Sequence, residues 1–234
     1  MREILQQGAA ALGVSLADRA LSDFEIYYRL LTERNRVMNL TAITGEAETA
    51  RLHFLDSLAL LPMATFAGAS VIDVGSGAGL PGLPLRIAEP TVRLTLLDAQ
   101  QKRVDFLMET AEALQIPCLC LHGRAEEQAL LPSMRDSYDL AVSRAVARLN
   151  LLCELCLPFV RVGGAFLAMK GTDADEELQE AAHALEVLGG VPERVHEYTV
   201  PGTDVRHRVV RIRKIAPTPG GYPRKFARIR KSPL

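Results

Sequence analysis

Three glycines at alternate positions, Gly75, Gly77 and Gly79, follow the apolar segment SVIDV (70–74). A chain that leaves a buried strand and reverses sharply favours glycine, because a residue without a Cβ accepts positive φ and lets the backbone approach a ligand closely. Pro81 stands where a helix would begin, a position that proline favours. In open α/β sheets, ligands bind in the crevice beyond the carboxyl ends of the strands. The segment therefore predicts a turn that binds an adenine-containing cofactor.

Two acidic residues narrow the choice of cofactor. Asp98 ends the next apolar segment, RLTLLD, where a carboxylate can bind the two hydroxyl groups of a ribose. Nicotinamide and S-adenosylmethionine enzymes both use this arrangement, and the literal G-x-G-x-x-G made by Gly77, Gly79 and Gly82 is weak evidence by itself. Asp73 stands where dinucleotide enzymes usually have an apolar residue, and it can receive the amino group of a methyl donor. These residues favour a methyltransferase.

Two other classes of enzyme use a glycine-rich turn after a strand. A nicotinamide- or flavin-dependent oxidoreductase stays open as the alternative, although the chain has no evident substrate domain with a proton donor. A nucleoside triphosphatase is disfavoured, because no G-x-x-x-x-G-K-S/T motif occurs.

Around the turn, apolar segments of strand length alternate with longer segments of helical periodicity. This alternation predicts an α/β, Rossmann-like fold with a mainly parallel sheet. Two strands near the C-terminus have no helix between them, so we expect an antiparallel hairpin at one edge and seven strands in all. The expected strands are 70–74, 93–98, 118–122, 139–143, 164–170, 195–200 and 207–214.

The chain divides into three regions. Residues 1–64 show helical periodicity in two stretches and are expected to form an N-terminal helical subdomain. Residues 65–216 contain the strands and the glycine turn and are expected to form the methyltransferase domain. Residues 217–234 are basic and rich in proline and glycine, and we expect them to form a flexible tail.

Charge is distributed unevenly along the 234 residues. The formal net charge is −1, with 27 basic and 28 acidic residues in all. The segment 206–234 contains ten Lys or Arg and no acidic residue, which leaves 17 basic and 28 acidic residues elsewhere, or −11. A cationic segment on an acidic body suggests a polyanionic partner, although a solvated strand and tail would look the same.

Targeting signals are not evident. The N-terminal segment lacks the apolar core of a signal peptide, and no stretch approaches the roughly 20 apolar residues of a membrane span. We therefore expect a cytoplasmic protein without a membrane partner.

The four cysteines raise the question of a metal. Cys153-x-x-Cys156 resembles half of a zinc site, and Cys118 and Cys120 alternate along an expected strand. A four-thiolate site would require these two elements to meet. We expect four reduced core cysteines and no metal.

Several polar residues have two interpretations. His53, Asp56 and Ser57 share one helix face by their spacing, so they form either a rim that faces a substrate or a capping cluster packed on the sheet. Lys170, at the end of the fifth strand, either touches the substrate or is solvated, and Arg124 is ambiguous in the same way. The remaining histidines are interpreted as surface or strand residues: His122, His183, His196 and His207.

Seven segments, taken in order, resemble one family. The set is similar to the ribosomal RNA small-subunit methyltransferase G family, also called the glucose-inhibited division protein B family, from about residue 35 to 171. HFLDSL and the second Pro-Gly of the glycine turn are more specific than the turn itself, and the basic strand HRVVRIRK is similar to the family's C-terminal end. The segments are NLTAIT (39–44), HFLDSL (53–58), DVGSGAGLPGLPL (73–85), LLDAQQKRVDFL (96–107), GRAEE (123–127), SRAVARL (143–149) and AMKG (168–171).

The resemblance implies S-adenosylmethionine-dependent N7-methylation of a guanine in 16S ribosomal RNA, with that RNA or the small ribosomal subunit as partner. It also implies that Gly75 and Leu80 contact the methyl donor, that Ala125 and Glu126 hold its adenine side, and that Arg144 completes the pocket. Such an enzyme would also bind RNA and act in ribosomal RNA processing.

The implied reaction needs no general base. Guanine N7 carries a lone pair and no proton at neutral pH, and a sulfonium methyl is already activated, so catalysis rests on alignment. Arg144, His53 and Lys170 are then expected to position the substrate. A bidentate grip of Arg144 on O6 and N7 would block the nucleophile, so we expect it to bind O6 alone, a phosphate or the donor's carboxylate. At Val146 the family often has an aromatic residue, a departure that bears on base stacking.

The RNA target is expected to be looped or splayed, because sequence-specific RNA readers mostly bind unstacked bases. A non-catalytic RNA-binding assembly factor is the second alternative, and the intact glycine turn with its two acidic residues argues against it.

Overall fold

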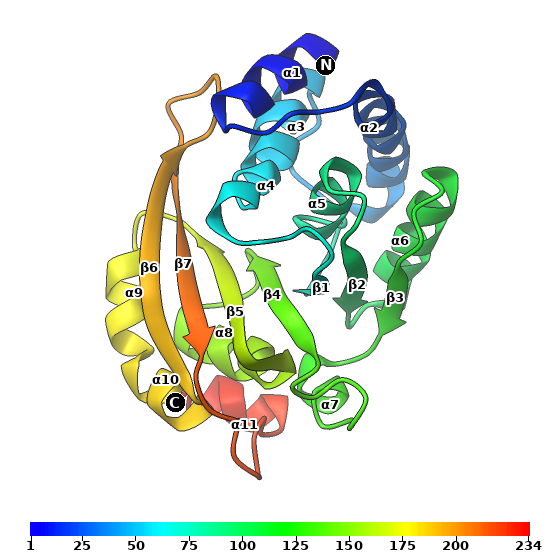
Figure 1. Ribbon diagram of the computed structural model, residues 1–234. Coiled ribbons are helices and arrows are strands. Elements are labelled where there is room, and N and C mark those ends of the chain that lie inside the picture. Colours follow the sequence, from blue (N-terminus) through cyan, green and yellow to red (C-terminus); the bar gives the residue numbers. More distant parts are fainter.

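A seven-stranded sheet forms the centre of the computed structural model, which describes residues 1–234 (Figure 1). The strand order is β3-β2-β1-β4-β5-β7-β6. The strands from β3 to β5 are parallel, whereas β7 runs antiparallel to both β5 and β6. The expected α/β fold with an antiparallel edge hairpin is therefore confirmed. The strands are β1 (Ser70–Val74), β2 (Arg93–Asp98), β3 (Leu119–His122), β4 (Tyr138–Arg144), β5 (Val160–Lys170), β6 (Gly190–Thr199) and β7 (Arg206–Lys214).

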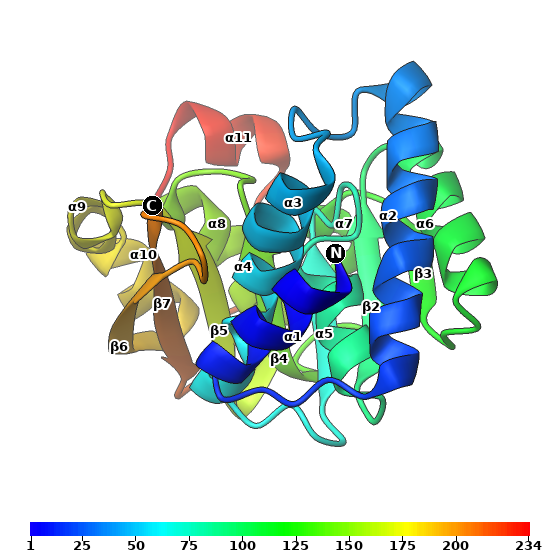
Figure 2. The ribbon, with the colours of Figure 1, turned by 90° about the horizontal axis from the view of Figure 1, so that it is seen from above.

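Both faces of the sheet are buried, because side chains alternate along each strand. In β1, Val71 packs into one hydrophobic core, and Ile72 and Val74 pack into a second core on the opposite face. Parallel strands that are buried on both faces require a layer of helices on each (Figure 2). The strand order reverses between β1 and β4, so the switch-point crevice, where ligands bind in such sheets, opens at their carboxyl ends.

The helices on the two faces of the sheet come from different parts of the chain. The first face is covered by the N-terminal helices together with α5 and α6, and the second by the helices that follow β3, β4, β5 and β7. The first layer contains α1 (Arg2–Ala11), α2 (Asp18–Met38), α3 (Glu46–Thr49), the π-helical turn η1 (Ala50–Leu55), α4 (Asp56–Leu58), the 3₁₀ turn η2 (Leu61–Met63), α5 (Gly82–Ala88) and α6 (Gln101–Ala113). The second contains α7 (Ala125–Gln128), α8 (Leu149–Cys156), the 3₁₀ turn η3 (Leu157–Phe159), α9 (Ala174–Glu180), α10 (Ala182–Leu188) and α11 (Phe226–Lys231).

Residues 1–64, the expected helical subdomain, are helical and share their core with the sheet. Leu5 of α1, Phe24 of α2 and Phe54 of η1 are fully buried in the same cluster as Val71 of β1. The rings of Phe24 and Phe54 lie 4.9 Å apart. These helices therefore form a layer on the domain, and the boundary between residues 64 and 65 stays a prediction.

The C-terminal segment 217–234 departs from the expectation of a flexible tail. It ends in α11, whose Ile229 is fully buried in the second core. Arg224 forms an ion pair with Glu154 of α8, a carboxylate with no exposed surface. The proline, glycine and charge content of this segment predicted mobility. Glu154 supplies a counter-charge for Arg224, however, and Ile229 packs into the second core. Seventy residues separate the two partners, so no local pattern reveals the pair.

Candidate functional site

The glycine turn after β1 has the backbone that its sequence predicts. Gly75, Gly77 and Gly79 have φ of +75°, +57° and +93°, values that disfavour residues with a Cβ. A Cβ on Gly79 would lie 2.8 Å from the hydroxyl of Tyr27, which donates to the backbone of the turn at 2.5 Å. A Cβ on Gly77 would meet only the Gly75 carbonyl, 3.8 Å away, so the space beside this residue is open. Gly79 is thus required by packing, and Gly77 leaves room for a ligand.

Asp98, at the end of β2, binds the backbone of the turn. One carboxylate oxygen accepts the N–H of Gly77 at 2.9 Å, and the other accepts the N–H of Gln100 at 2.9 Å. Arg103 lies 3.5 Å away. Each oxygen of a carboxylate has a second lone pair, so acceptor capacity remains for a ribose hydroxyl.

Asp73 is fully buried in β1, and only one of its two carboxylate oxygens accepts a backbone hydrogen bond. Its Oδ2 accepts the N–H of Gly82, the first residue of α5, at 2.8 Å. Its Oδ1 has no hydrogen-bond partner. Burial raises the pKa of Asp73 to about 7, outweighing the opposing effect of the Gly82 N–H. A buried acceptor without a donor costs about 1–3 kcal/mol, so Oδ1 is an atom that a cationic ligand group would stabilise.

A small cavity of about 140 Å³ adjoins the turn, at the carboxyl ends of β1, β2 and β3. It brings Gly75 together with Ala125 and Glu126, as expected for the adenine side of a cofactor. Leu80 does not line it: its side chain is buried in the first core, so only its backbone is available to a ligand. The lining residues are Val74, Gly75, Leu97, Ala99, Gly123, Arg124, Ala125, Glu126, Val146, Leu155 and Phe226.

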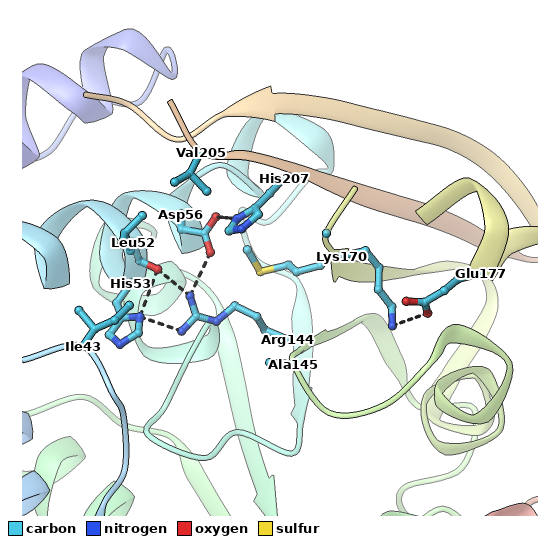
Figure 3. Close-up of a pocket in the computed structure, with 12 residues that line it drawn as sticks. Ile43, Leu52, His53, Asp56, Arg144, Ala145, Lys170, Glu177, Val205 and His207 are labelled. Carbon is cyan, nitrogen blue, oxygen red and sulfur yellow. Dashed lines mark hydrogen bonds and ion pairs between the residues drawn. The ribbon is translucent and has the colours of Figure 1, made fainter. Parts of the chain in front are cut away.

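A larger cavity of about 550 Å³ lies beyond the ends of β4 and β5, beneath the N-terminal helical layer (Figure 3). It brings together the three residues that were expected to position a substrate, namely His53 of η1, Arg144 of β4 and Lys170 of β5. Its other lining residues are Ile43, Leu52, Asp56, Ala145, Met169, Gly171, Glu177, Val205 and His207.

Arg144 is held by the helical layer. Its Nη1 donates to Asp56 Oδ2 at 3.0 Å and to the Leu52 carbonyl at 3.1 Å, and its Nη2 lies 3.2 Å from His53 Nδ1 (Figure 3). A guanidinium has five N–H donors, so two remain: the Nε–H and one Nη2–H. The side chain is therefore fixed in direction and keeps donors for a ligand in the cavity.

Asp56 joins four elements at this point. Its Oδ1 accepts the hydroxyl of Tyr198 of β6 and Nδ1 of His207 of β7, both at 2.7 Å, while Oδ2 faces Arg144. Burial alone would raise the pKa of Asp56, but the His207 hydrogen bond and the Arg144 charge outweigh burial and hold that pKa below its usual range. The same hydrogen bond raises the pKa of His207.

His53 is neutral at physiological pH. Burial, aided by the positive charge of Arg144, lowers its pKa to about 4. The Nδ1 atom lies 3.1 Å from the Leu52 carbonyl and 3.2 Å from Arg144 Nη2. The Nε2 atom faces Thr41 Oγ1 at 2.7 Å, so both ring nitrogens have a partner.

Lys170 is neither solvated nor free. Its Nζ donates to the Ala147 carbonyl at 2.5 Å and forms an ion pair with Glu177 at 2.7 Å, and its side chain is 8% exposed. Glu177 also accepts the N–H of Leu149, the first residue of α8. Lys170 therefore fixes the loop that follows Arg144.

The other ambiguous residues are also placed. Ser57 does not line the cavity and donates to the His53 carbonyl at 2.6 Å, whereas His53 and Asp56 both line the cavity. His207, which was expected to be an unremarkable strand residue, lines the cavity and binds Asp56. Arg124 pairs with Glu126 at 3.1 Å and packs on the ring of Phe226.

Sequence reasoning missed His207, Tyr198 and Glu177. The edge hairpin and α9 contribute them from far along the chain. The only local signal was that Tyr198 and His207 stand in strands near the basic C-terminal region, which does not identify a partner for Asp56.

The cysteines do not form a metal site. Cys118 and Cys120 pack against the first core, and Cys153 and Cys156 lie in the second core, on the other face of the sheet. All four are free thiols, and no group of three or more potential ligands is arranged to hold an ion.

No helix combines the length and the apolar character needed to cross a bilayer.

The sheet order, the glycine turn after β1 and the acid after β2 define a methyltransferase fold. An S-adenosylmethionine-dependent methyltransferase from Aquifex aeolicus matches with a TM-score of 0.55 over 74% of this chain and 96% of that chain, at 17% identity. TrmN from Thermus thermophilus matches with a TM-score of 0.52 over 69% of this chain and 48% of that chain, at 20% identity. These likenesses establish the fold.

The chain belongs to the rRNA small subunit methyltransferase G family, whose model matches residues 20–207. It is 43% identical to the ribosomal RNA small subunit methyltransferase G of Acetivibrio thermocellus, over 100% of this chain and 97% of the relative. The relative of the same name from Lachnoclostridium phytofermentans is 45% identical over 97% of this chain and 95% of its own length. The oxidoreductase interpretation is therefore disfavoured.

The cofactor of this family is S-adenosylmethionine, and the residues present fit it. The unpartnered Oδ1 of Asp73 suits an ammonium group, Asp98 keeps acceptor capacity for a ribose, and the open face of Gly77 lets a ligand approach the backbone.

Proposed function

We propose that this protein transfers a methyl group from S-adenosylmethionine to N7 of a guanine in 16S ribosomal RNA. Family membership supports the reaction. The observation that carries the assignment of the site is the presence of two cavities at the carboxyl ends of the parallel strands. One lies at the glycine turn and the other beside Arg144, and the consecutive residues Val146 and Ala145 line the first and the second. An enzyme that acts on ribosomal RNA works in the cytoplasm in this proposal.

The first cavity and the turn hold the cofactor in this proposal. Asp98 accepts the ribose hydroxyls, and Asp73 Oδ1 accepts the amino group. Ala125 and Glu126 border the adenine. The remaining contacts come from the backbone of the turn at Gly75, Gly77, Gly79 and Leu80.

The second cavity receives the guanine. Bound S-adenosylmethionine supplies an activated sulfonium methyl, and guanine N7 needs no deprotonation, so the residues here align and do not transfer protons. His53 suits this role, because its low pKa leaves it uncharged beside Arg144. The remaining Nε–H and Nη2–H of Arg144 bind guanine O6 or a phosphate. Lys170 acts indirectly, through its hold on the loop carbonyl of Ala147.

RNA reaches these cavities along a cationic surface. Of the ten basic residues in 206–234, several are used internally, since Lys214 is fully buried and Arg208, Arg211 and Arg224 form ion pairs. The exposed cations without an ion pair are Arg206, Arg213, Lys225, Arg228, Arg230 and Lys231.

The test supplies tritium-labelled S-adenosylmethionine and 16S ribosomal RNA from cells that lack the activity. We expect label at N7 of a single guanine, located by base-specific cleavage. Asp98→Ala should lose incorporation, because the ribose and the turn both lose their acceptor. Asp105→Ala, at an exposed carboxylate of α6, is the matched control and should keep it. Label on protein or on a small molecule would refute the substrate, and RNA binding without incorporation would favour an assembly factor.

A further inference from the structure

The wall of the cofactor cavity includes one residue from the far end of the chain. All the other lining residues lie within residues 74–155, on β1, β2, α7, α8 and the loops that follow β1, β2, β3 and β4. The exception is Phe226, the first residue of α11. In Figure 1, α11 lies beside α7, the helix that begins at Ala125.

The ring of Phe226 is held where it meets the adenine side of the cavity. The guanidinium of Arg124 lies over the ring, 4.2 Å from its centroid, in the geometry of a cation–π contact. Arg124 in turn pairs with Glu126, so the ring, the cation and a cavity carboxylate form one stack at the start of α7. Arg124 thus covers one face of the ring, and the ring lines the cavity together with Ala125 and Glu126.

Two side chains of the domain, Arg135 and Glu154, hold the segment that leads to Phe226 in place. Arg135 donates to the carbonyls of Thr218 at 2.6 Å and Tyr222 at 2.8 Å. Glu154, with no exposed surface, accepts both the backbone N–H of Arg224 at 2.7 Å and its guanidinium at 2.6 Å. These contacts involve an internal carboxylate and backbone carbonyls, so the segment is built into the domain.

We propose that Phe226 is a cofactor-pocket residue that forms the wall against the adenine ring, and that the C-terminal segment is thereby part of the cofactor site. The proposal rests on the proposed function, because it assumes that the cavity takes the adenine of S-adenosylmethionine. An aromatic ring suits this place, since a base packed on an aromatic side chain gains affinity through its π-face.

The first experiment measures the affinity for S-adenosylhomocysteine by calorimetry. Phe226→Ala should weaken binding at least about 5-fold, the low end for removing an aromatic ring on which a base stacks. Phe226→Tyr should restore most of the affinity. Ala227→Ser, at an exposed position of the same helix, should bind within about 2-fold of the unmodified protein. Equal affinity for Phe226→Ala and the unmodified protein would overturn the proposal.

Adenosine alone separates a wall at the adenine from a contact elsewhere on the ligand. If Phe226 borders the adenine, Phe226→Ala should weaken adenosine binding by the same factor as S-adenosylhomocysteine binding. Undiminished adenosine binding by this variant would overturn the assignment to the adenine. Failure of the unmodified protein to bind S-adenosylhomocysteine would instead overturn the proposed function, which keeps the two failures distinct.

The second experiment distinguishes contact from a general loosening of the segment. The chain contains no tryptophan, so Phe226→Trp creates a single fluorophore at the cavity. Its emission should change saturably with S-adenosylhomocysteine. Val162→Trp is the control, because Val162 lies near the amino end of β5, away from the carboxyl ends of the strands where the cavity lies. The emission of this variant should not change with ligand. Unchanged emission of Phe226→Trp at ligand concentrations that saturate the site by calorimetry would refute contact.

Discussion

At the scale of single residues, the cavity beside Arg144 depends on how its buried charges are neutralised. His53 stays uncharged beside Arg144, whose positive charge is compensated by Asp56. Asp73 keeps a buried oxygen without a donor. Burial shifts the pKa of His53 and of Asp73. Titratable groups with shifted pKa values cluster at functional sites.

The low pKa of His53 predicts how stability changes with pH. Its pKa is about 4 in the folded protein and about 6.5 when unfolded, so between these values the unfolded chain binds more protons and stability falls as pH falls. When pH is lowered from 7.5 to 5.0, the free energy of unfolding should decrease in both proteins. The decrease should be about 2 kcal/mol larger for the unmodified protein than for His53→Gln. Urea denaturation at both values measures this. His183→Gln, at an exposed position, should behave like the unmodified protein, and an equal pH response of His53→Gln would contradict the assignment.

At the scale of elements, the cavity beside Arg144 forms where the N-terminal helical layer and the edge hairpin meet at the carboxylate of Asp56. Asp56, directly after the π-helical turn, receives Arg144 from β4, Tyr198 from β6 and His207 from β7. A π-helical turn shifts the side chains that follow it relative to a regular helix. The register of this short segment therefore determines which polar groups face the cavity.

Removing that carboxylate should loosen all four elements. Asp56→Ala leaves the partly buried guanidinium of Arg144 without its counter-charge, and breaking a buried pair costs up to about 3–5 kcal/mol. We expect a loss of this size in the free energy of unfolding, measured by urea denaturation at pH 7.5. Asp175→Ala removes an exposed partner of Arg208 and should change stability by less than about 1 kcal/mol. A loss below that level for Asp56→Ala would show that the network is not stabilising.

At the scale of the whole molecule, the C-terminal segment closes the fold and carries charge on its outside. Its inner side contributes Ile229 and Phe226, and its ion pair with Glu154 neutralises a buried carboxylate of α8. Its outer side presents the cations of α11 and its N-terminal flank beside the cofactor cavity. One segment thus links the core, the cofactor site and the expected RNA surface.

Deleting residues 218–234 should destabilise the domain, because Glu154 is left buried without Arg224. Loss of such a pair costs about 3–5 kcal/mol, or a melting temperature lower by about 10 °C for a domain of this size. Scanning calorimetry measures the shift. Glu154→Leu in the shortened chain should recover part of it, since the unpaired charge is then gone. A shortened chain that melts with the full chain would mean that the segment adds no stability.

The outer cations should determine the salt dependence of RNA binding. Changing Lys225, Arg228, Arg230 and Lys231 together to Gln should weaken binding to ribosomal RNA. It should also make the slope of log K against log salt shallower by up to about 3, at roughly 0.7 for each single-strand phosphate that is no longer neutralised. Arg194→Gln, an exposed cation of β6 outside the basic C-terminal segment, should leave the slope unchanged. Filter binding over a salt series measures both, and an unchanged slope in the fourfold variant would mean that the RNA binds elsewhere.

The sequence by itself determined the parallel sheet with its edge hairpin. It also placed Asp73 in β1, Asp98 at the end of β2 and the glycines on the turn between β1 and α5. These features depend on local periodicity, on the positive φ that glycine accepts and on where consecutive strands end. Each of these can be recognised within a sequence window of about 30 residues. The resemblance added Arg144, Ala125 and Glu126, and all three line a cavity.

Only the tertiary structure decided the partners of those residues. Asp56 meets His207 across 151 positions, and Glu154 meets Arg224 across 70. Phe226 reaches the cavity of Gly75 from the opposite end of the chain. Such pairs form because each buried charge or apolar ring needs a partner from whichever element packs against it. That choice depends on the packing of the whole chain, which local pattern does not contain.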